Sequence, residues 1–168
     1  HDYIRAAVSK GARVVVSERV VELPDGVSNL VVPDARAAVA VMARNLYSDP
    51  SRALTLVGIT GTNGKTSTAY LAQRVLEVGG FPCARFGTVA HEIAGEERPA
   101  ATTTPDALEM NRLLRAAVDA GQTSAVAEVS SHALVGRRLD GITLQVAAWA
   151  NLTQDHLDFH HTMDAYRD

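Results

Sequence analysis

The sequence VGITGTNGKTS, at residues 57–67, is the stretch on which the expected fold depends. An apolar run at residues 54–57 leads into it and predicts a buried strand. Residues 66–78 follow it, carry apolar side chains on more than one helical face and end at Gly79-Gly80, so they predict a helix. A strand, a glycine-rich turn and a helix in this order are the setting of a phosphate-binding loop. Glycine lets the backbone approach a polyphosphate, and the N–H groups at the helix start point toward it.

Two side chains of this loop have the chemistry that nucleotide binding requires. Lys65 would place a positive charge near the β- and γ-phosphates, and the Thr66 hydroxyl would hold Mg²⁺. The strict pattern G-x-x-x-x-G-K-[ST] is not met, because Ile59 stands five positions before Gly64 and the glycine is displaced to Gly61. The plainer alternative is a glycine-rich turn that carries an exposed lysine.

The composition is that of a soluble globular protein with a net charge of −3, and 168 residues can hold one domain or parts of two. We find no signal peptide and no apolar run long enough to span a bilayer. The single cysteine, Cys83, excludes an intrachain disulfide and fits a reducing cytoplasm. The charge balance predicts no nucleic-acid binding. We therefore expect a cytoplasmic monomer without membrane insertion, and the absent initiator Met suggests a fragment.

The first 52 residues predict a small α/β unit that forms part of an N-terminal domain. Turn-forming residues at 48–52 mark the boundary, and the second domain is expected to span residues 53–168. The first part carries no cluster of catalytic residue types, so a scaffold is its simplest interpretation. Its predicted elements are a helix at 2–10, strands at 13–17 and 29–32, and a helix at 35–47.

Strands and helices alternate through the second part of the chain. Thr104 is expected to cap the helix that runs to residue 120, with Pro105 in its first position. This alternation predicts an α/β fold in which a mostly parallel sheet, containing the phosphate loop, is flanked by helices and carries functional residues at the carboxyl ends of its strands. The other predicted elements are strands at 83–89, 125–129 and 144–150, a hairpin turn at 93–98 and a helix that has begun before residue 168.

Polar residues at the ends of these elements are candidates for function. Glu128 ends an apolar strand in register with the loop strand, where it would hold Mg²⁺ opposite Thr66; the alternative is a carboxylate turned to solvent. Thr103 and Thr104 would place hydroxyls and N–H groups at a helix start, where an anionic substrate could bind. The alternative is that they form only a capped turn.

Two histidines, His156 and His160, are four residues apart in the run DHLDFHH and could share a helical face. That spacing is compatible with a zinc site, but no third ligand of the right type is near in the sequence. A role near ATP and Mg²⁺ fits better, although Mg²⁺ prefers oxygen ligands to imidazole.

Four motifs in this order resemble the Mur ligases, ATP-dependent enzymes that join amino acids to carboxylates. The closest likeness is to the members that add the third residue of the peptidoglycan stem peptide. It covers nearly the whole chain, as the latter part of a UDP-binding N-terminal domain and most of a central ATP-binding domain. The motifs are GTNGKTS at 61–67, TTTPD at 102–106, EVSSHAL at 128–134 and NLTQDHLDFH at 151–160.

The resemblance implies a role for each matching residue. Lys65, Glu128 and His156 would be catalytic, with Thr66 and Glu128 holding a first Mg²⁺ ion and His156 helping to hold a second. The residues implied to bind ATP are Gly61, Thr62, Asn63, Gly64, Lys65, Thr66 and Ser67, with Asn151 near the nucleotide. The residues implied to contact the UDP-muramoyl dipeptide are Thr103, Thr104, Ser130 and Arg138.

The resemblance also shows what is missing. Gly136 stands two residues before Arg138, where a glutamine often stands in the family, so one hydrogen bond to substrate that the resemblance implies is not expected from this position. A carbamylated lysine that bridges to the second metal would fall past Asp168, and the chain has no counterpart of the domain that binds the amino acid. We therefore expect residues 1–168 alone to be unable to complete ligation.

The implied reaction adds a diamino acid, meso-diaminopimelate or L-lysine, to UDP-N-acetylmuramoyl-L-alanyl-D-glutamate. ATP would convert the carboxylate into an acyl phosphate, and the amine would then displace phosphate. Three alternatives remain: a ligase like folylpolyglutamate synthetase, a P-loop switch or motor, and a nucleotide-binding module without ligase activity. TTTPD and EVSSHAL, with no switch motif, argue against the switch or motor.

Overall fold

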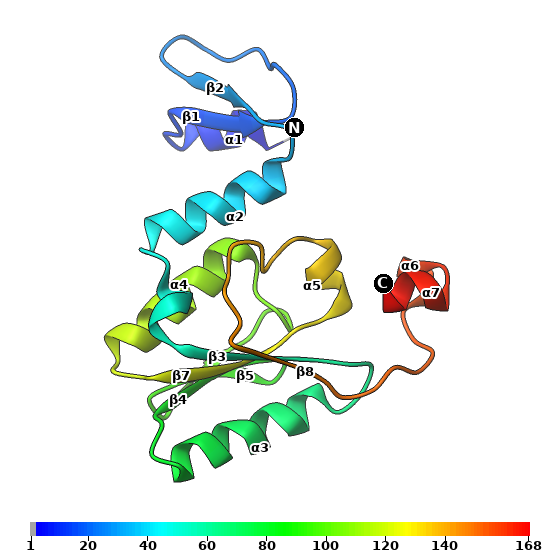
Figure 1. Cartoon of the computed structure of the whole chain (residues 1–168). Helices are drawn as coiled ribbons and strands as arrows, with labels where there is room; N and C mark the ends of the chain where they lie inside the picture. Colours follow the sequence, from blue (N-terminus) through cyan, green and yellow to red (C-terminus); the bar gives the residue numbers. More distant parts are fainter. Residues whose placement is uncertain (1–2) are drawn as a thin grey trace. The chain divides into compact units, whose positions relative to one another are not determined.

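The computed structural model describes residues 3–168 and contains two compact units, one up to Val39 and the other Ala40–Asp168. Figure 1 labels most of their helices and strands. The boundary that the sequence predicts at residues 48–52 stays a prediction; the units divide earlier, inside a helix. Among residues 3–168, no helix combines the length and the apolar character that crossing a bilayer requires.

The first unit has the predicted order of helix, strand, strand and helix. Its elements are α1 (Ile4–Ser9), β1 (Val14–Ser17), β2 (Ser28–Val31) and the start of α2 (Ala35–Leu46). The two strands are parallel, with Val14 opposite Ser28. Asn29 holds the long connection between them, because its amide accepts from Val21 N at 3.0 Å and donates to Val15 O at 3.1 Å. Residue 2 of the predicted first helix lies outside the described residues.

The second unit is built on a six-stranded sheet of order β6-β5-β4-β7-β3-β8. The neighbours β4, β7, β3 and β8 are parallel, whereas β5 and β6 form an antiparallel hairpin at one edge. The predicted α/β fold with a mostly parallel sheet is therefore confirmed. The strands are β3 (Thr55–Thr60), β4 (Cys83–Phe86), β5 (Ala90–Ile93), β6 (Glu96–Pro99), β7 (Ser124–Glu128) and β8 (Val146–Trp149).

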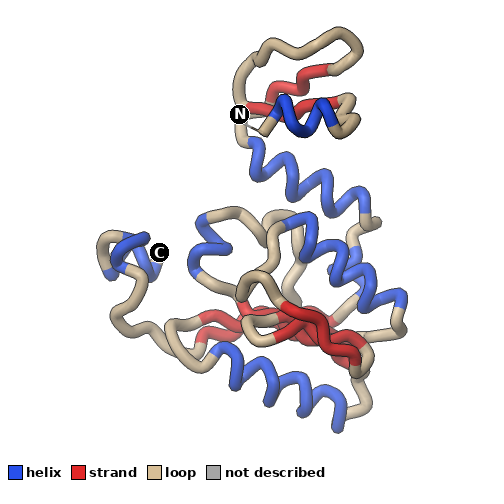
Figure 2. Tube along the Cα trace, turned by 180° about the vertical axis from the view of Figure 1, so that it is seen from behind, coloured by secondary structure: helices blue, strands red, loops and turns tan. Residues whose placement is uncertain are grey.

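Helices flank this sheet on both faces, as Figures 1 and 2 show. α3 (Lys65–Val78) lies on one face, and α4 (Ala107–Asp119) and α5 (Ser131–Val135) lie on the other. The short helix η1 (Pro50–Ala53) leads into β3, and the segment after β8 carries α6 (Leu157–His160) and α7 (Met163–Arg167). At five residues α5 is too short to show a hydrophobic period, which is why the sequence did not reveal it.

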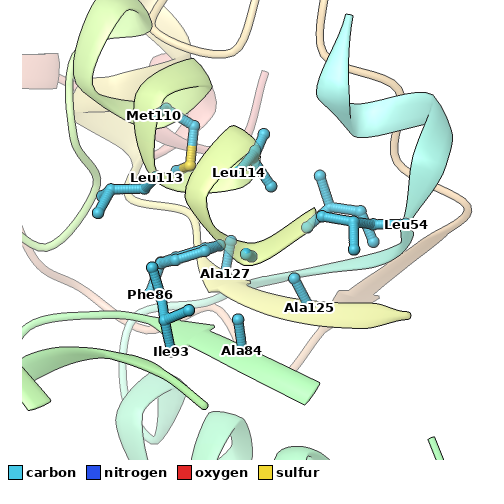
Figure 3. Close-up of a cluster of buried hydrophobic side chains, with 11 residues drawn as sticks. Leu54, Ala84, Phe86, Ile93, Met110, Leu113, Leu114, Ala125 and Ala127 are labelled. Carbon is cyan, nitrogen blue, oxygen red and sulfur yellow. The ribbon is translucent and has the colours of Figure 1, made fainter. Parts of the chain in front are cut away.

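The larger hydrophobic core fills the space between α4 and the sheet (Figure 3). Phe86 of β4 meets Met110 and Leu114 of α4 there, each almost fully buried. The helix positions spaced for burial in the sequence, Ala107 among them, are buried, and Ala117 also belongs to this core. On the other face, α3 packs over a smaller cluster of Ile59, Ala69, Cys83 and Val126. Burial raises the pKa of the Cys83 thiol, so it stays protonated.

The start of α4 differs from the prediction. Its N-cap is Asp106, whose carboxylate accepts from Glu109 N at 2.9 Å, and not Thr104. Thr104 is 0% exposed and its hydroxyl donates instead to Glu128 O at 2.9 Å. An aspartate followed three residues later by glutamate is itself a capping signal, and it marks the observed start. The predicted cap at Thr104 was therefore wrong.

The hairpin also differs from the prediction. Its turn is only Ala94-Gly95, with φ of 54° and 83°, and the residues on either side form β5 and β6. Two successive positive φ angles are those of the tight turns that suit a twisted hairpin. The predicted strand at 83–89 ends at Phe86, because Gly87 and Thr88 leave the sheet toward β5.

A buried arginine fastens this hairpin to α3. Arg85 is 2% exposed, lies 3.6 Å from the centroid of the Tyr70 ring and donates from Nε to Gln73 Oε1 at 2.9 Å. Its Nη2 lies 3.4 Å from Glu97 Oε1 of β6, and Gln73 also bonds to Glu92 of β5. A buried charge needs such partners, so the antiparallel strands are held in place as the guanidinium is satisfied.

His91 of β5 predicts a pH dependence of stability. It is 4% exposed, and its Nδ1 has no hydrogen-bond partner among the described residues. Burial lowers the pKa of His91 below 6.5, so the unfolded chain binds this proton more readily than the folded one. The contribution of the neutral His91 side chain to the free energy of unfolding is therefore complete above pH 6.5 and declines as the pH falls below that value. We expect the unfolding free energy to fall more between pH 7 and pH 5 in the wild type than in His91→Gln.

Urea unfolding of both proteins at the two pH values measures this difference. Both proteins contain the same carboxylates, so the contribution of these groups to the pH dependence cancels in the comparison. Equal losses of stability in the wild type and in His91→Gln would mean that burial does not perturb this imidazole.

Candidate functional site

The loop between β3 and α3 owes its shape to two glycines. Gly64 is the N-cap of α3 with φ of 82°, and Gly61 has φ of 140°. A Cβ added at Gly61 would lie 3.0 Å from Asn151 N and 3.2 Å from the Cβ of Ala150. The glycine is therefore required where the segment after β8 passes the loop. Ile59, at the position of the usual first glycine, lies within β3 and is 1% exposed.

The start of α3 presents two sources of positive potential. The N–H groups of Lys65, Thr66 and Ser67 precede the first intrahelical bond, which Thr68 N donates to Gly64 O at 2.9 Å. The Lys65 ammonium is half-buried and donates to Gly61 O at 2.6 Å and to Thr62 O within the loop. Free N–H groups and a lysine at a helix start form a site for an anion.

Asn151 holds the loop in this shape. Its Oδ1 accepts from Asn63 N at 2.9 Å, its Nδ2 donates to Asn63 O at 2.8 Å, and its carbonyl accepts from Thr62 N at 3.1 Å. The predicted proximity of Asn151 to the loop is present. Because Asn151 takes up the N–H groups of Thr62 and Asn63, the N–H groups at the start of α3 are the ones left to face an anion.

The hydroxyl of Thr62 joins the loop to the C-terminal segment. Thr62 is 7% exposed; its Oγ1 donates to Thr153 O at 3.1 Å, accepts from Thr153 N at 3.0 Å and lies 3.0 Å from the Tyr166 hydroxyl. The side chain predicted to bind ATP is therefore turned toward the protein. Sequence reasoning missed Thr153 and Tyr166, because no local pattern marks a partner about a hundred residues away.

Glu128 lies where the register predicted, opposite Ile59 of β3. It is 1% exposed, and its Oε2 accepts from Thr66 Oγ1 at 2.9 Å. A residue that the sequence did not mark, Thr88, donates to the same carboxylate from its backbone N at 3.0 Å and from its hydroxyl at 3.1 Å. The structure thus brings Thr66 and Glu128 together, as predicted.

These oxygens suit Mg²⁺, which prefers hard oxygen ligands. Next to them, Gly87 leaves room that a side chain would fill, since an added Cβ would overlap the Glu128 carboxylate. The Thr66 hydroxyl and the Glu128 carboxylate therefore fit a magnesium ion. Among residues 3–168, no three His, Cys, Asp or Glu side chains are grouped so as to bind a metal.

His156 belongs to a cluster of rings. Its ring centroid lies 4.8 Å from that of His132 and 6.1 Å from that of Tyr166, and it is the N-cap of α6 with φ of 51°. His160 is 7% exposed, and its Nε2 lies 2.9 Å from Ser131 Oγ. Burial, and then the neighbouring His156 and His160, lower the pKa of His132. His156 and His160 thus both border His132, and the metal role of His156 stays a prediction.

The four predicted substrate residues come together beside the end of β7. Arg138 Nη1 donates to Thr104 O at 2.7 Å, and Thr104 Oγ1 accepts from Ser130 N at 2.9 Å. Ser130 also caps α5, accepting from Ala133 N at 3.3 Å. The hydroxyls of Thr103 and Thr88 are 3.1 Å apart, which connects this group to Glu128.

Two pockets border these groups. One combines Lys65, Ser130 and His156 with Trp149 and Tyr166, two aromatic residues that the sequence did not mark. The other joins Arg138 to the start of α4, and its lining residues are His91, Pro99, Ala101, Thr102, Pro105, Asp106, Glu109 and Arg138. The phosphate loop, Ser130 and Arg138 therefore border open space, whereas the predicted substrate residue Thr104 is fully buried.

The chain is similar in sequence to known proteins. Residues 59–168 match the Mur ligase middle domain family. The chain is 44% identical over 166 residues to the UDP-N-acetylmuramoyl-L-alanyl-D-glutamate–2,6-diaminopimelate ligase of Geobacter metallireducens, covering 99% of this chain and 32% of that protein. It is 43% identical to the enzyme of the same name from Geobacillus thermodenitrificans, covering 99% of this chain and 34% of the relative.

Solved structures extend the likeness to the fold. A structure of a UDP-N-acetylmuramoyl-L-alanyl-D-glutamate–2,6-diaminopimelate ligase matches with a TM-score of 0.83 at 32% identity, over 98% of this chain and 33% of that one. A MurF ligase from Thermotoga maritima in complex with ADP shares the fold, with a TM-score of 0.61 at 20% identity over 99% of this chain and 35% of that one. The chain spans about a third of the length of the curated relatives it matches. With its middle-domain match, it belongs to the Mur ligase family.

Proposed function

We propose that this protein takes part in peptidoglycan precursor synthesis, as an ATP-dependent ligase that adds 2,6-diaminopimelate to UDP-N-acetylmuramoyl-L-alanyl-D-glutamate. The observation that carries the proposal is the contact of Thr66 with Glu128, on the same sheet edge as Thr104 and Arg138. The relatives with 44% and 43% identity carry 2,6-diaminopimelate in their names, which favours it over lysine.

The loop and α3 are proposed to hold the ATP phosphates. The N–H groups of Lys65, Thr66 and Ser67 would donate to phosphate oxygens. The Lys65 ammonium would exchange its hydrogen bonds to Gly61 O and Thr62 O for hydrogen bonds to a phosphate. Asn151 keeps the loop open for this purpose by satisfying the backbone of Asn63. The γ-phosphoryl group would thereby be oriented toward the substrate residues.

Thr66 and Glu128 are proposed to bind Mg²⁺ through their hydroxyl and carboxylate oxygens. The ion, when bound, supplies charge neutralisation on the phosphates of ATP. Thr88 donates to Glu128 from its backbone N and its hydroxyl, so the carboxylate would need little reorganisation on binding the ion.

The substrate carboxylate is proposed to lie beside Thr103, Ser130 and Arg138. Arg138 can donate to an anion through a planar pair of N–H groups, and the hydroxyls add further donors. Transfer of the γ-phosphoryl group would form an acyl phosphate and ADP. Attack by the diamino acid's amine would then form the amide and release phosphate.

A ligation assay with the full-length gene product tests the proposal. It receives ATP, Mg²⁺ and the UDP-muramoyl dipeptide, with either 2,6-diaminopimelate or L-lysine, and mass spectrometry detects the tripeptide. We expect tripeptide and ADP in the diaminopimelate reaction only, and neither without ATP. ATP hydrolysis without tripeptide from either amino acid would favour the nucleotide-binding module instead.

The substrate arginine gives a sharper prediction. We expect Arg138→Ala to raise the KM for the UDP-muramoyl dipeptide by about tenfold or more, since a hydrogen bond to a charged group is worth roughly 1.5–3 kcal/mol. The KM for ATP should change little, because Arg138 donates to Thr104 O and lies outside the phosphate-loop residues 61–67. Steady-state kinetics with each substrate varied in turn measures both.

The control for this variant is Arg74→Ala, which removes an exposed arginine paired with Glu77 on α3. It should leave both constants unchanged. A weaker ATP affinity with normal dipeptide affinity in Arg138→Ala would assign this arginine to the nucleotide.

A further inference from the structure

The Glu128 carboxylate is held mainly by one residue outside the family motifs. Glu128 is 1% exposed, and a buried carboxylate is costly unless donors surround it. Of the three donors from residues 3–168 that reach it, one is the Thr66 hydroxyl at 2.9 Å. The other two belong to Thr88, whose backbone N lies 3.0 Å from Oε1 and whose hydroxyl lies 3.1 Å from Oε2. Thr88 therefore contacts both oxygens of the carboxylate.

The path of the chain before Thr88 makes this contact possible. β4 and β7 are parallel with Phe86 opposite Ala127, so the residues that follow them emerge side by side. Gly87 comes next, and a Cβ there would overlap the Glu128 carboxylate. The absence of a side chain at Gly87 lets the backbone N–H of Thr88 approach Oε1 directly. Gly87 and Thr88 thus form a cradle for the carboxylate.

The Thr88 hydroxyl also faces a substrate residue. Its oxygen lies 3.1 Å from the hydroxyl oxygen of Thr103 as well as 3.1 Å from Glu128 Oε2. A hydroxyl has a single hydrogen, and a carboxylate is the stronger acceptor. The hydrogen of Thr88 Oγ1 therefore goes to Glu128 Oε2, and Thr103 Oγ1 is a second acceptor within its reach. The Thr66 hydroxyl donates to the same oxygen, Glu128 Oε2, so two hydroxyls meet at this atom.

We propose that Thr88 is a positioning residue of the ligase: its hydroxyl and backbone N–H fix the Glu128 carboxylate in the orientation that binds Mg²⁺ with Thr66. This inference rests on the proposed function. With two groups of Thr88 on two different oxygens, the carboxylate cannot rotate without breaking a bond. A hydrogen bond to a charged group is among the stronger ones in proteins, so losing the hydroxyl frees one oxygen to turn away from Thr66.

Variants of Thr88 in the full-length gene product test the proposal. Thr88→Val has the shape of threonine without the hydroxyl, and Thr88→Ser keeps the hydroxyl. Thr123→Val, outside the site and before β7, is the matched control. The first readout is binding of a fluorescent ATP analogue across a range of Mg²⁺ concentrations. We expect the Mg²⁺ concentration at half-maximal binding to rise about tenfold in Thr88→Val and to stay within about twofold of wild type in Thr88→Ser.

The second readout is kinetic. In the ligation assay, kcat of Thr88→Val should fall at limiting Mg²⁺ while the KM for the dipeptide stays unchanged, and raising Mg²⁺ should restore most of the rate. Binding of the ATP analogue without Mg²⁺ should be the same in all variants. Thermal unfolding confirms that each variant is folded, and Thr88→Ala replaces Thr88→Val if the latter does not melt cooperatively.

Two outcomes would overturn the role of Thr88. One is a Thr88→Val protein with the Mg²⁺ dependence of the wild type. The other is a Thr88→Ser protein as impaired as Thr88→Val, because packing of the methyl group and not the hydroxyl would then explain the loss. If the wild type forms no tripeptide, the proposed function fails, and the binding readout still decides whether Thr88 orients Glu128.

Discussion

Replacing Lys65 by alanine is expected to abolish ATP turnover while leaving the fold intact. The ammonium of Lys65 is the one basic side chain among the loop residues 61–67, and it bonds to Gly61 O and Thr62 O. Loss of a preorganised donor to a transferring group costs about 10²–10³-fold in rate. ADP formation in the ligation assay measures the loss, and circular dichroism checks the fold.

Two further variants separate charge from loop structure. Lys65→Gln keeps a donor for the loop carbonyls but has no charge, so we expect it to be as inactive as Lys65→Ala. Lys10→Ala, at the C-cap of α1, removes a lysine far along the chain from the loop and should be fully active. Normal ADP formation by a folded Lys65→Ala protein would refute the assignment of a phosphate-binding loop.

Glu128→Gln is expected to have the second large effect. The substitution preserves the size of the side chain but replaces one acceptor oxygen by an NH₂ group. That group would face donors, because the hydroxyls of Thr66 and Thr88 both point at Oε2 and the backbone N of Thr88 points at Oε1. We expect kcat to fall by about 10²-fold or more, and added Mg²⁺ to restore little of it, since both the charge and the geometry are lost.

The stability of this variant should fall as well. A buried donor left without an acceptor costs about 1–3 kcal/mol, which urea unfolding can resolve. Glu96→Gln, at the exposed start of β6, is the control and should alter neither activity nor stability. A Glu128→Gln protein with near-normal kcat would show that this carboxylate does not serve the reaction.

Much of the fold follows from local sequence patterns. The apolar run before the loop and the helical segment after it became β3 and α3, and the spacing of Met110 and Leu114 predicted the buried face of α4. Burial of apolar side chains imposes a period that can be read in the sequence. The cap of α4 was predicted at Thr104 and is Asp106, because two polar residues on either side of Pro105 each satisfied a capping rule, and the hydrogen bond of Thr104 to Glu128 O decided between them.

The candidate site was predicted in part for the same reason. Lys65 and Thr66 lie within one turn of the loop, so their proximity depends on local geometry alone. The meeting of Thr66 with Glu128 required only that β3 and β7 be parallel neighbours, which alternating strands and helices favour. The roles of these residues in binding ATP and substrate remain predictions for the experiments above.

The sequence by itself determined the strand, loop and helix around Lys65 and the α/β class of the fold, because both arise from interactions between residues close in the chain. Only the tertiary structure decided that Thr88 cradles Glu128, 40 residues away, and that Thr62 bonds to Tyr166, 104 residues away. Such contacts depend on the order of strands in the sheet and on where each strand ends. A polar side chain that hydrogen-bonds to a buried group on another element belongs to no periodic pattern or motif in the sequence. Its role can therefore be recognised only in the folded structure.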